Sequence, residues 1–299
     1  MKSTAALLFF LLLAATPATA ASLEEAQAAI DAGNYTLALG SARELAEGGE
    51  PRAMTMLGIM YRKGQGVKAN LDVAIDWLSR AADLDQSPAQ LALALIYLDP
   101  KSSVADYPKG EGWLRRAADS GNADAQFNMG LLTAGAFGNP PELPLAADWF
   151  RKAAAQGHPA ATYNLGVFYL AGRGVEKNII EAARLIGNAA QAGNVDAMLD
   201  YGVLVLRGEG VKQNEKIGAQ WLLVSARRGN VIAQNRVARL YAFGKGVNQD
   251  PIEALKWNIL AGRAGRGDAE LDTMLGALTG EQKAQAQALA DAFKPQAAK

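Results

Sequence analysis

Six copies of a 36-residue pattern follow one another in this sequence, and such a chain folds as a stack of similar units. One column of the pattern is alanine without exception: Ala53, Ala89, Ala125, Ala161, Ala197 and Ala233. Another column holds all five tryptophans, at Trp77, Trp113, Trp149, Trp221 and Trp257, with Leu185 in the fourth copy. Agreement of several columns in one register excludes chance, so the repeat decides the fold class.

Each copy has the pattern of two helices. In the first copy we predict helices over 53–62 and 71–82, separated by "KGQGV", whose glycines tolerate left-handed backbone. Asn70 is a suitable N-cap for the second helix, and Trp77 lies on one face of it with Ala81. The sequence therefore predicts an all-α fold, a right-handed α-solenoid of stacked helix-turn-helix repeats with period 36.

The glycine pairs and the tryptophans have structural interpretations. "GQGV", "GRGV", "GEGV" and "GKGV" begin at Gly64, Gly172, Gly208 and Gly244. None is followed by the Lys-Ser/Thr of a phosphate-binding loop, and none joins a strand to a helix. The tryptophan column is predicted to be buried in helix packing, with Trp77, Trp149, Trp221 and Trp257 as its clearest members.

The pattern "LGIMY.KGQGV.....A..W...AA", with a close copy in "LGVFYLAGRGV", resembles the Sel-one-like repeat (SLR) branch of the tetratricopeptide superfamily. The resemblance covers Pro51 to Arg266 as six units, although the second and third units lack the loop glycines. It implies a binding scaffold, because relatives act as adaptors in signalling, envelope processes and host interaction. It also implies that first helices line the concave surface.

The predicted organisation has four segments: a signal peptide over 1–20, an N-terminal capping helix pair over 21–50, six SLR-type repeats over 51–266, and C-terminal capping helices with a frayed tail over 267–299. Ala269 lies 36 residues after Ala233, which predicts a seventh first helix from Gly267 to Leu278. Thr279 and Gln282 have the spacing of a capping box for a last helix.

The N-terminus has the layout of a secretory signal peptide. Lys2 precedes an apolar run over 5–15, and Ala18-Thr19-Ala20 has the small-x-small spacing of a cleavage site. The run is too short for a spanning helix, although an uncleaved anchor is the alternative. We therefore expect a periplasmic or secreted protein with no stable membrane insertion after signal cleavage.

Composition excludes several kinds of function. The formal charge is zero, so nothing attracts nucleic acid in general. The chain has no cysteine and one histidine, which excludes Cys/His zinc sites, Cys nucleophiles and iron–sulfur clusters. His158 occupies a turn column that holds asparagine in three other copies, at Asn122, Asn194 and Asn230, and no Ser-x-x-Lys is present. We expect no catalytic residue, no metal and no cofactor.

Candidate binding residues come from the first helices, just before each Leu-Gly pair and one turn later. Asn and Arg can bond a peptide's backbone or carboxylate, and aromatic side chains can anchor an apolar one. The alternative is a merely solvated face. The predicted residues are Phe127, Asn128, Tyr163, Asn164, Asp200, Asn235, Arg236 and Arg239.

Three functions remain open at this stage. The first is an exported, non-catalytic scaffold that binds another protein or a peptide segment, as an adaptor or regulator in the bacterial envelope or at the host interface. The second is a protein that binds peptidoglycan fragments or glycans, motivated by the export signal and the aromatic-plus-Asn row. The third is a hydrolase, for which no constellation of residues is present.

Overall fold

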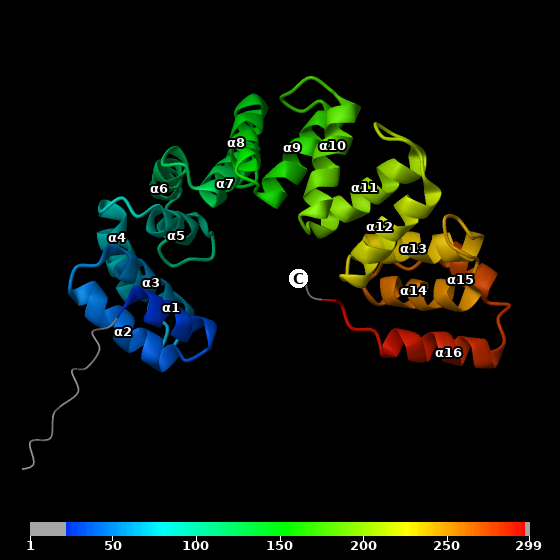
Figure 1. Cartoon of the computed structure of the whole chain (residues 1–299), viewed down its shortest axis with the longest axis horizontal. Helices are drawn as coiled ribbons and strands as arrows, with labels where there is room; N and C mark the ends of the chain where they lie inside the picture. The colour runs from blue at the N-terminus through cyan, green and yellow to red at the C-terminus, as the bar shows by residue number, and fades with distance from the viewer. Residues whose placement is uncertain (1–21, 297–299) are drawn as a thin grey trace, which may run out of the picture. The chain divides into compact units, whose positions relative to one another are not determined.

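The structure is a computed structural model that describes residues 22–296, so the signal segment expected over 1–20 lies outside the described residues. Within 22–296 the chain forms 16 helices and no strand, which confirms the all-α repeat fold (Figure 1). The chain divides into two compact parts, one ending at Leu93 and one beginning at Ala94. The division falls inside one helix, α5 (Ser87–Leu98).

The first part contains four complete helices. They are α1 (Leu23–Asp31), α2 (Tyr35–Glu47), α3 (Pro51–Lys63) and α4 (Leu71–Asp83). Each packs against the next along the chain. The helices predicted over 53–62 and 71–82 are confirmed as α3 and α4, and Asn70 caps α4 by accepting the Val73 N–H at 3.1 Å.

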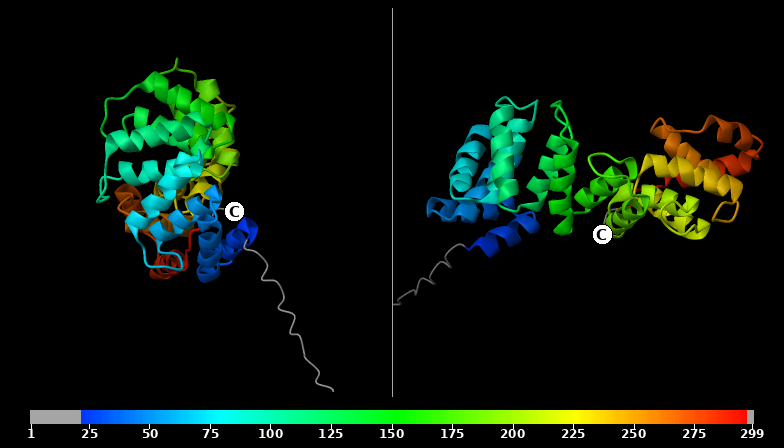
Figure 2. Two further views of the ribbon diagram at one scale, coloured as in Figure 1. Left: turned by 90° about the vertical axis from the view of Figure 1, so that its left-hand side faces the viewer. Right: turned by 90° about the horizontal axis from the view of Figure 1, so that it is seen from above.

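The second part continues the same alternation of helices (Figure 2). After the end of α5 it contains α6 (Tyr107–Asp119), α7 (Ala123–Thr133), α8 (Leu143–Ala155), α9 (Pro159–Ala171), α10 (Ile179–Gln191), α11 (Val195–Arg207), α12 (Glu215–Arg227), α13 (Val231–Phe243), α14 (Pro251–Arg263), α15 (Ala269–Leu275) and α16 (Gly280–Asp291). Helices α7, α9, α11 and α13 are the first helices of successive repeats.

The second glycine of each loop pair allows one repeat to touch the preceding one. Gly208 ends α11 in the left-handed conformation at φ 73°, and Gly210 is also left-handed at φ 69°. A Cβ on Gly210 would collide with the carbonyl oxygen of Ile179, at the start of α10. Gly246 lies in the same way against Glu215. The first glycine thus ends the helix, and the second lets the loop lie against the preceding repeat. Both roles are structural, as the sequence predicts.

The core column lies one residue after the tryptophan column. Its members are buried to 2% exposure or less: Leu78, Leu114, Phe150, Ile186, Leu222 and Asn258. Leu78, Phe150, Ile186 and Leu222 each lie against the glycine of the first helix, and a Cβ on Gly130 would lie 2.5 Å from the Phe150 ring. Helices therefore approach closely where the repeat supplies glycine.

The prediction that the tryptophans are buried is wrong for part of the column. Trp149 and Trp257 are buried, at 5% and 2% exposure, but Trp77 and Trp221 are only half-buried. Their position lies at the edge of the helix interface, where a cation can cover the ring. The Arg80 guanidinium lies 4.1 Å from the Trp77 ring centroid, and the Arg116 guanidinium lies 5.5 Å from that of the half-buried Trp113.

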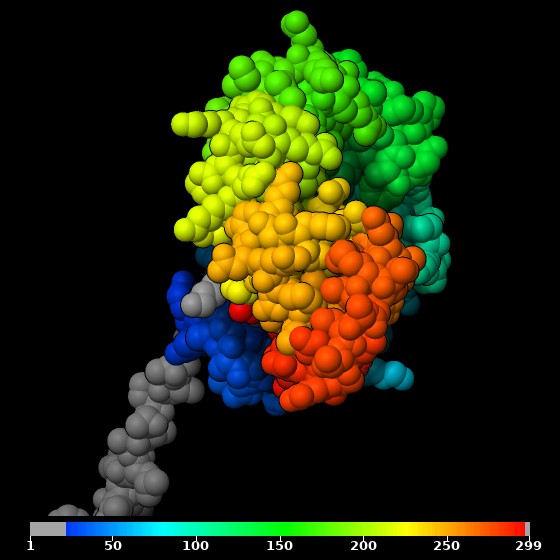
Figure 3. Space-filling view, turned by 90° about the vertical axis from the view of Figure 1, so that its right-hand side faces the viewer, coloured from blue at the N-terminus to red at the C-terminus, as the bar shows by residue number. Residues whose placement is uncertain are grey.

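The C-terminal helices cover the last repeat (Figure 3). The first helix of a seventh unit, expected from Gly267 to Leu278, is shorter than predicted. Helix α15 covers only Ala269–Leu275, and Gly276 is its C-cap. The capping box of Thr279 and Gln282 begins α16, as predicted. Phe293 lies edge-on to Trp257, with ring centroids 5.5 Å apart, and the Gln296 N–H donates to the Arg227 carbonyl at 2.9 Å.

Candidate functional site

All eight predicted binding residues lie on first helices of the second part. Phe127 and Asn128 are on α7, Tyr163 and Asn164 on α9, Asp200 on α11, and Asn235, Arg236 and Arg239 on α13. Asn128, Asn164, Asp200 and Arg236 lie at equivalent positions of successive first helices, Phe127, Tyr163 and Asn235 lie one position earlier, and Arg239 lies about one turn later. We call Asn128, Tyr163, Asn164, Asp200 and Arg236 the polar row.

Tyr163 and Asp200 join two helices of the polar row. The Tyr163 hydroxyl donates to Asp200 Oδ2 at 2.8 Å, linking α9 to α11. Burial raises the pKa of Tyr163, and the nearby Asp200 carboxylate raises it further. Burial also raises the pKa of Asp200, against the hydrogen bond from Tyr163 and the charge of Arg236, which both lower it. The row thus holds a half-buried carboxylate close to an exposed cation.

Asn128 and Asn164 hold matching conformations. Each donates its side-chain NH₂ to the carbonyl four residues earlier, Asn128 to Asp124 at 2.7 Å and Asn164 to Ala160 at 2.8 Å. Each half-buried side chain keeps its amide oxygen and second hydrogen for another partner. Within residues 22–296, the exposed Arg236 guanidinium forms neither a hydrogen bond nor an ion pair. These three side chains can therefore contact a ligand.

Phe127 is part of the packing between repeats. Its ring stacks on His158 with centroids 4.7 Å apart and lies 6.0 Å from the Phe150 ring. His158 is the N-cap of α9, as its turn column predicts, because its Nδ1 accepts the Ala161 N–H at 3.1 Å. Phe127 is half-buried against this core, so its ring is largely covered by the protein itself.

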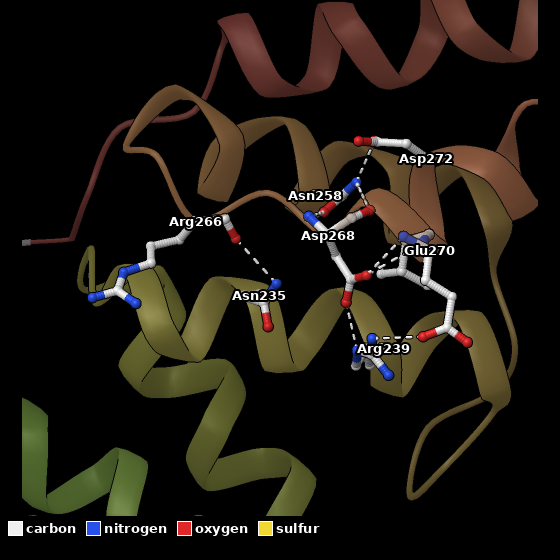
Figure 4. A network of polar contacts seen from close by, with 8 residues as sticks. Asn235, Arg239, Asn258, Arg266, Asp268, Glu270 and Asp272 are labelled. Carbon is white, nitrogen blue, oxygen red and sulfur yellow. Dashed lines mark hydrogen bonds and ion pairs between the residues drawn. The ribbon is translucent and has the colours of Figure 1, made fainter.

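Asn235 and Arg239 hold the C-terminal segment (Figure 4). The Asn235 NH₂ donates to the Arg266 carbonyl at 3.0 Å. The Arg239 guanidinium donates to both Asp268 and Glu270, reaching Glu270 Oε2 at 2.9 Å. The hydrogen bond from Arg239 holds the pKa of the Asp268 carboxyl below its usual range. These two predicted residues thus link α13 to the segment that begins α15, and both use hydrogen-bonding groups within the protein itself.

Asn258 is a structural residue that the sequence analysis missed. It occupies the core column that is Leu, Phe or Ile in the other repeats, yet it is buried to 2% exposure. Its side chain accepts the Asp268 N–H at 2.9 Å and donates to Asp272 Oδ1 at 2.6 Å (Figure 4). The departure from an apolar column was the available signal, and it marks where the repeat meets the cap.

A cavity in the first part was also missed. Its volume is about 350 Å³, and its lining includes Met56 and Ile59 of α3. Met56 occupies the same repeat column as Asn128 and Asn164. The column therefore faces an accessible surface in the first repeat too, where its residues are apolar.

Among residues 22–296 no three His, Asp or Glu side chains come together in a group that could hold a metal ion. None of the helices in the described chain combines the length and apolarity needed to span a bilayer.

A known repeat family matches this chain, and its repeats begin where the helix pairs of the structure do. The Sel1 repeat family profile matches six segments: 51–86, 87–122, 123–158, 159–194, 195–230 and 231–265. The chain belongs to this family, whose members are commonly protein-interaction modules and generally non-catalytic scaffolds. None of the curated proteins matches the sequence.

Two solved structures are similar over most of this chain. A Sel1 repeat protein from Oxalobacter formigenes is 33% identical with a TM-score of 0.75, and the match covers 81% of this chain and 100% of that one. A protective antigen of uropathogenic Escherichia coli with an SLR fold is 27% identical with a TM-score of 0.80. The second match covers 87% of this chain but only 56% of the antigen.

Proposed function

We propose that this chain is an exported, non-catalytic scaffold that binds an extended segment of another protein along the polar row. The observation that carries the proposal is the placement of Asn128, Asn164 and Arg236. Each lies at the same register of a first helix with hydrogen-bonding groups left over. Amide and guanidinium groups spaced along a groove can bond successive backbone groups or carboxylates of one segment.

Export is proposed from the N-terminal sequence. Lys2, the apolar run over 5–15 and the Ala18-Thr19-Ala20 site support secretion with cleavage after Ala20. The resulting protein would act in the bacterial envelope or at the host interface, as an adaptor or regulator of its partner. Mass spectrometry of the protein from its host should find an N-terminus at Ala21, and a chain starting at Met1 in the cytosol would contradict export.

The binding proposal is tested by site-specific photocrosslinking in the native host. A crosslinking amino acid placed at Asn164 or Arg236 should give adducts with the same protein, mapping to neighbouring residues of one short segment. The same amino acid at Asp148, exposed on the second helix α8, serves as the control and should not give that adduct. Adducts only from the control position, or capture of peptidoglycan fragments instead of protein, would contradict the proposal.

A further inference from the structure

The cavity of the first part is a groove along one face of α3. Its floor follows residues three or four apart on that helix, and α1 and the start of α5 form its sides. Half of the lining residues are apolar: Leu23, Ile30, Met56, Ile59, Met60 and Pro88. Methionine side chains adapt their shape to a bound group, so the half-buried Met56 suits a surface that accepts side chains from elsewhere, above the buried Met60.

The charged residues of the groove are both cations. Arg52 lies near the start of α3 and Lys63 is its last residue, and no acidic residue lines the cavity. Within residues 22–296 neither cation forms an ion pair. The neighbouring Glu50 carboxylate is engaged as the N-cap of α3, accepting the Arg52 backbone N–H at 3.2 Å, and Asp31 accepts from Gln27 at 2.9 Å. An apolar floor between two unpaired cations complements an anionic, apolar ligand.

The spacing of the two cations and the volume of the cavity favour an extended ligand over a helical one. Arg52 and Lys63 are 11 positions apart on one helix, which separates them by about 16 Å at 1.5 Å per residue. An α-helix of that length and about 10 Å diameter would occupy roughly 1,300 Å³, several times the 350 Å³ of the cavity. An extended segment sends only alternate side chains into the groove, so the two residues that face the cations must be an even number apart; six residues span about 20 Å, which the long side chains of Arg52 and Lys63 can reach.

We propose that this groove binds an extended segment of a partner protein with two carboxylates six residues apart and apolar side chains at the alternate positions between them. The carboxylates pair with Arg52 and Lys63, and the apolar side chains cover Met56 and Ile59. The site is separate from the polar row, because every residue of the row lies in the second part.

The test uses the full chain after its signal segment and a labelled peptide, Glu-Ser-Leu-Ser-Leu-Ser-Glu, whose two glutamates and two leucines share one face when extended, with binding followed by fluorescence anisotropy. We expect saturable binding that weakens with added salt, since the ionic contacts are exposed. The double variant Arg52→Glu/Lys63→Glu should bind at least tenfold more weakly, because each contact to a charged group is lost and replaced by repulsion. Both residues are exposed, so the thermal melt should not change.

Controls separate this site from nonspecific attraction and from the polar row. Arg62→Glu changes the exposed neighbour of Lys63, which does not line the cavity, and should leave the affinity unchanged. A peptide with lysines in place of the glutamates, or serines in place of the leucines, should not bind. The Asn128→Ala/Asn164→Ala/Arg236→Ala variant should bind the peptide as the wild type does. Failure of the wild type to bind, or equal binding by the Arg52→Glu/Lys63→Glu variant, would overturn the proposal.

Discussion

His158 is structurally equivalent to an asparagine at the same place in other repeats. Its Nδ1 caps α9, and its Nε2 lies 3.1 Å from Asp124 Oδ1. Asn230 makes the same two contacts, accepting the Ala233 N–H at 2.9 Å and donating to Asp196 at 2.9 Å. Because Nδ1 must accept, the proton resides on Nε2 and is donated to Asp124. The only histidine of the chain is therefore explained by helix capping and by a link between repeats.

His158→Asn should retain the stability of the wild type, because asparagine can form both hydrogen bonds. His158→Ala removes the cap and should lower the free energy of unfolding by about 0.5–2 kcal/mol. Urea unfolding of the two variants measures the difference. Equal losses in both would show that stacking on Phe127, rather than capping, is the contribution of this side chain.

The stability of the protein should depend on pH through Asp200, because burial raises the pKa of this side chain above the ordinary value of a carboxyl group. The folded protein holds this proton more tightly than the unfolded chain does, so the contribution of Asp200 to stability is greatest below the ordinary pKa. It is lost as the pH rises through the raised value. Asp200→Asn cannot titrate, yet it still offers an oxygen to the Tyr163 hydroxyl.

The wild type should therefore lose stability relative to Asp200→Asn as the pH rises from the ordinary carboxyl pKa of about 4 through the raised value. Urea unfolding of both proteins at several pH values gives this difference. The prediction is contradicted if the free energies of unfolding of the two proteins change in parallel with pH, or if the wild type becomes more stable relative to the variant as the pH rises. Either result would show that the hydrogen bond from Tyr163 and the charge of Arg236 lower the pKa of Asp200 at least as much as burial raises it.

At the scale of the elements, contact between loops and helices of neighbouring repeats depends on glycine. Gly210 and Gly265 are both left-handed, at φ 69° and 73°. A Cβ on Gly210 would meet the Ile179 carbonyl, whereas a Cβ on Gly265 would find nothing within 4 Å. Substitution of Gly265 therefore measures only the cost of a left-handed residue with a side chain. Substitution of Gly210 adds the cost of the steric clash with α10.

Gly265→Ala should cost about 1–2 kcal/mol, the conformational penalty of a left-handed alanine. Gly210→Ala should cost clearly more, because α10 must also move away from the loop. Thermal or urea unfolding followed by two probes is suitable, since repeat arrays can unfold in stages. Similar losses at both positions would mean that the loop adjusts without disturbing the preceding repeat.

The period of 36 was sufficient to predict the helices, because small residues, caps and glycine stops recur at fixed places in each copy. The same pattern predicted the turn role of His158. It could not show that Arg239 and Asn235 bind Asp268 and Arg266, because these contacts depend on how α15 packs after the last repeat. Nor could it show the exposure of Trp77, since helical spacing alone does not distinguish the centre of an interface from its edge.

At the scale of the whole molecule, the last helices close the hydrophobic core of the second part. Helix α16 packs on α14, and Arg263 donates to the Ala290 carbonyl at 3.1 Å. The same region covers Trp257 and Leu260, at 2% and 8% exposure. A terminal unit with a polar outer face keeps a repeat stack soluble.

Deletion from Gly267 to the C-terminus should expose this core. We expect a lower melting temperature and concentration-dependent self-association, measured by thermal melting and size-exclusion chromatography. A deletion variant that stays monomeric with an unchanged melt would show that α14 is a sufficient end for the stack.

The most direct test of binding along the polar row is an affinity measurement. The partner found by crosslinking is titrated with the wild type and with two matched triple variants. A single Asn128→Ala or Asn164→Ala change should weaken binding by less than about twentyfold. Asn128→Ala/Asn164→Ala/Arg236→Ala should weaken it by roughly a hundredfold or more, without a lower melting temperature. The control changes the exposed Asp148, Arg184 and Gln220 to alanine, at one register of the second helices, and should bind as the wild type does. An unchanged affinity in the polar-row variant, or an equal loss in the control, would contradict binding along the polar row.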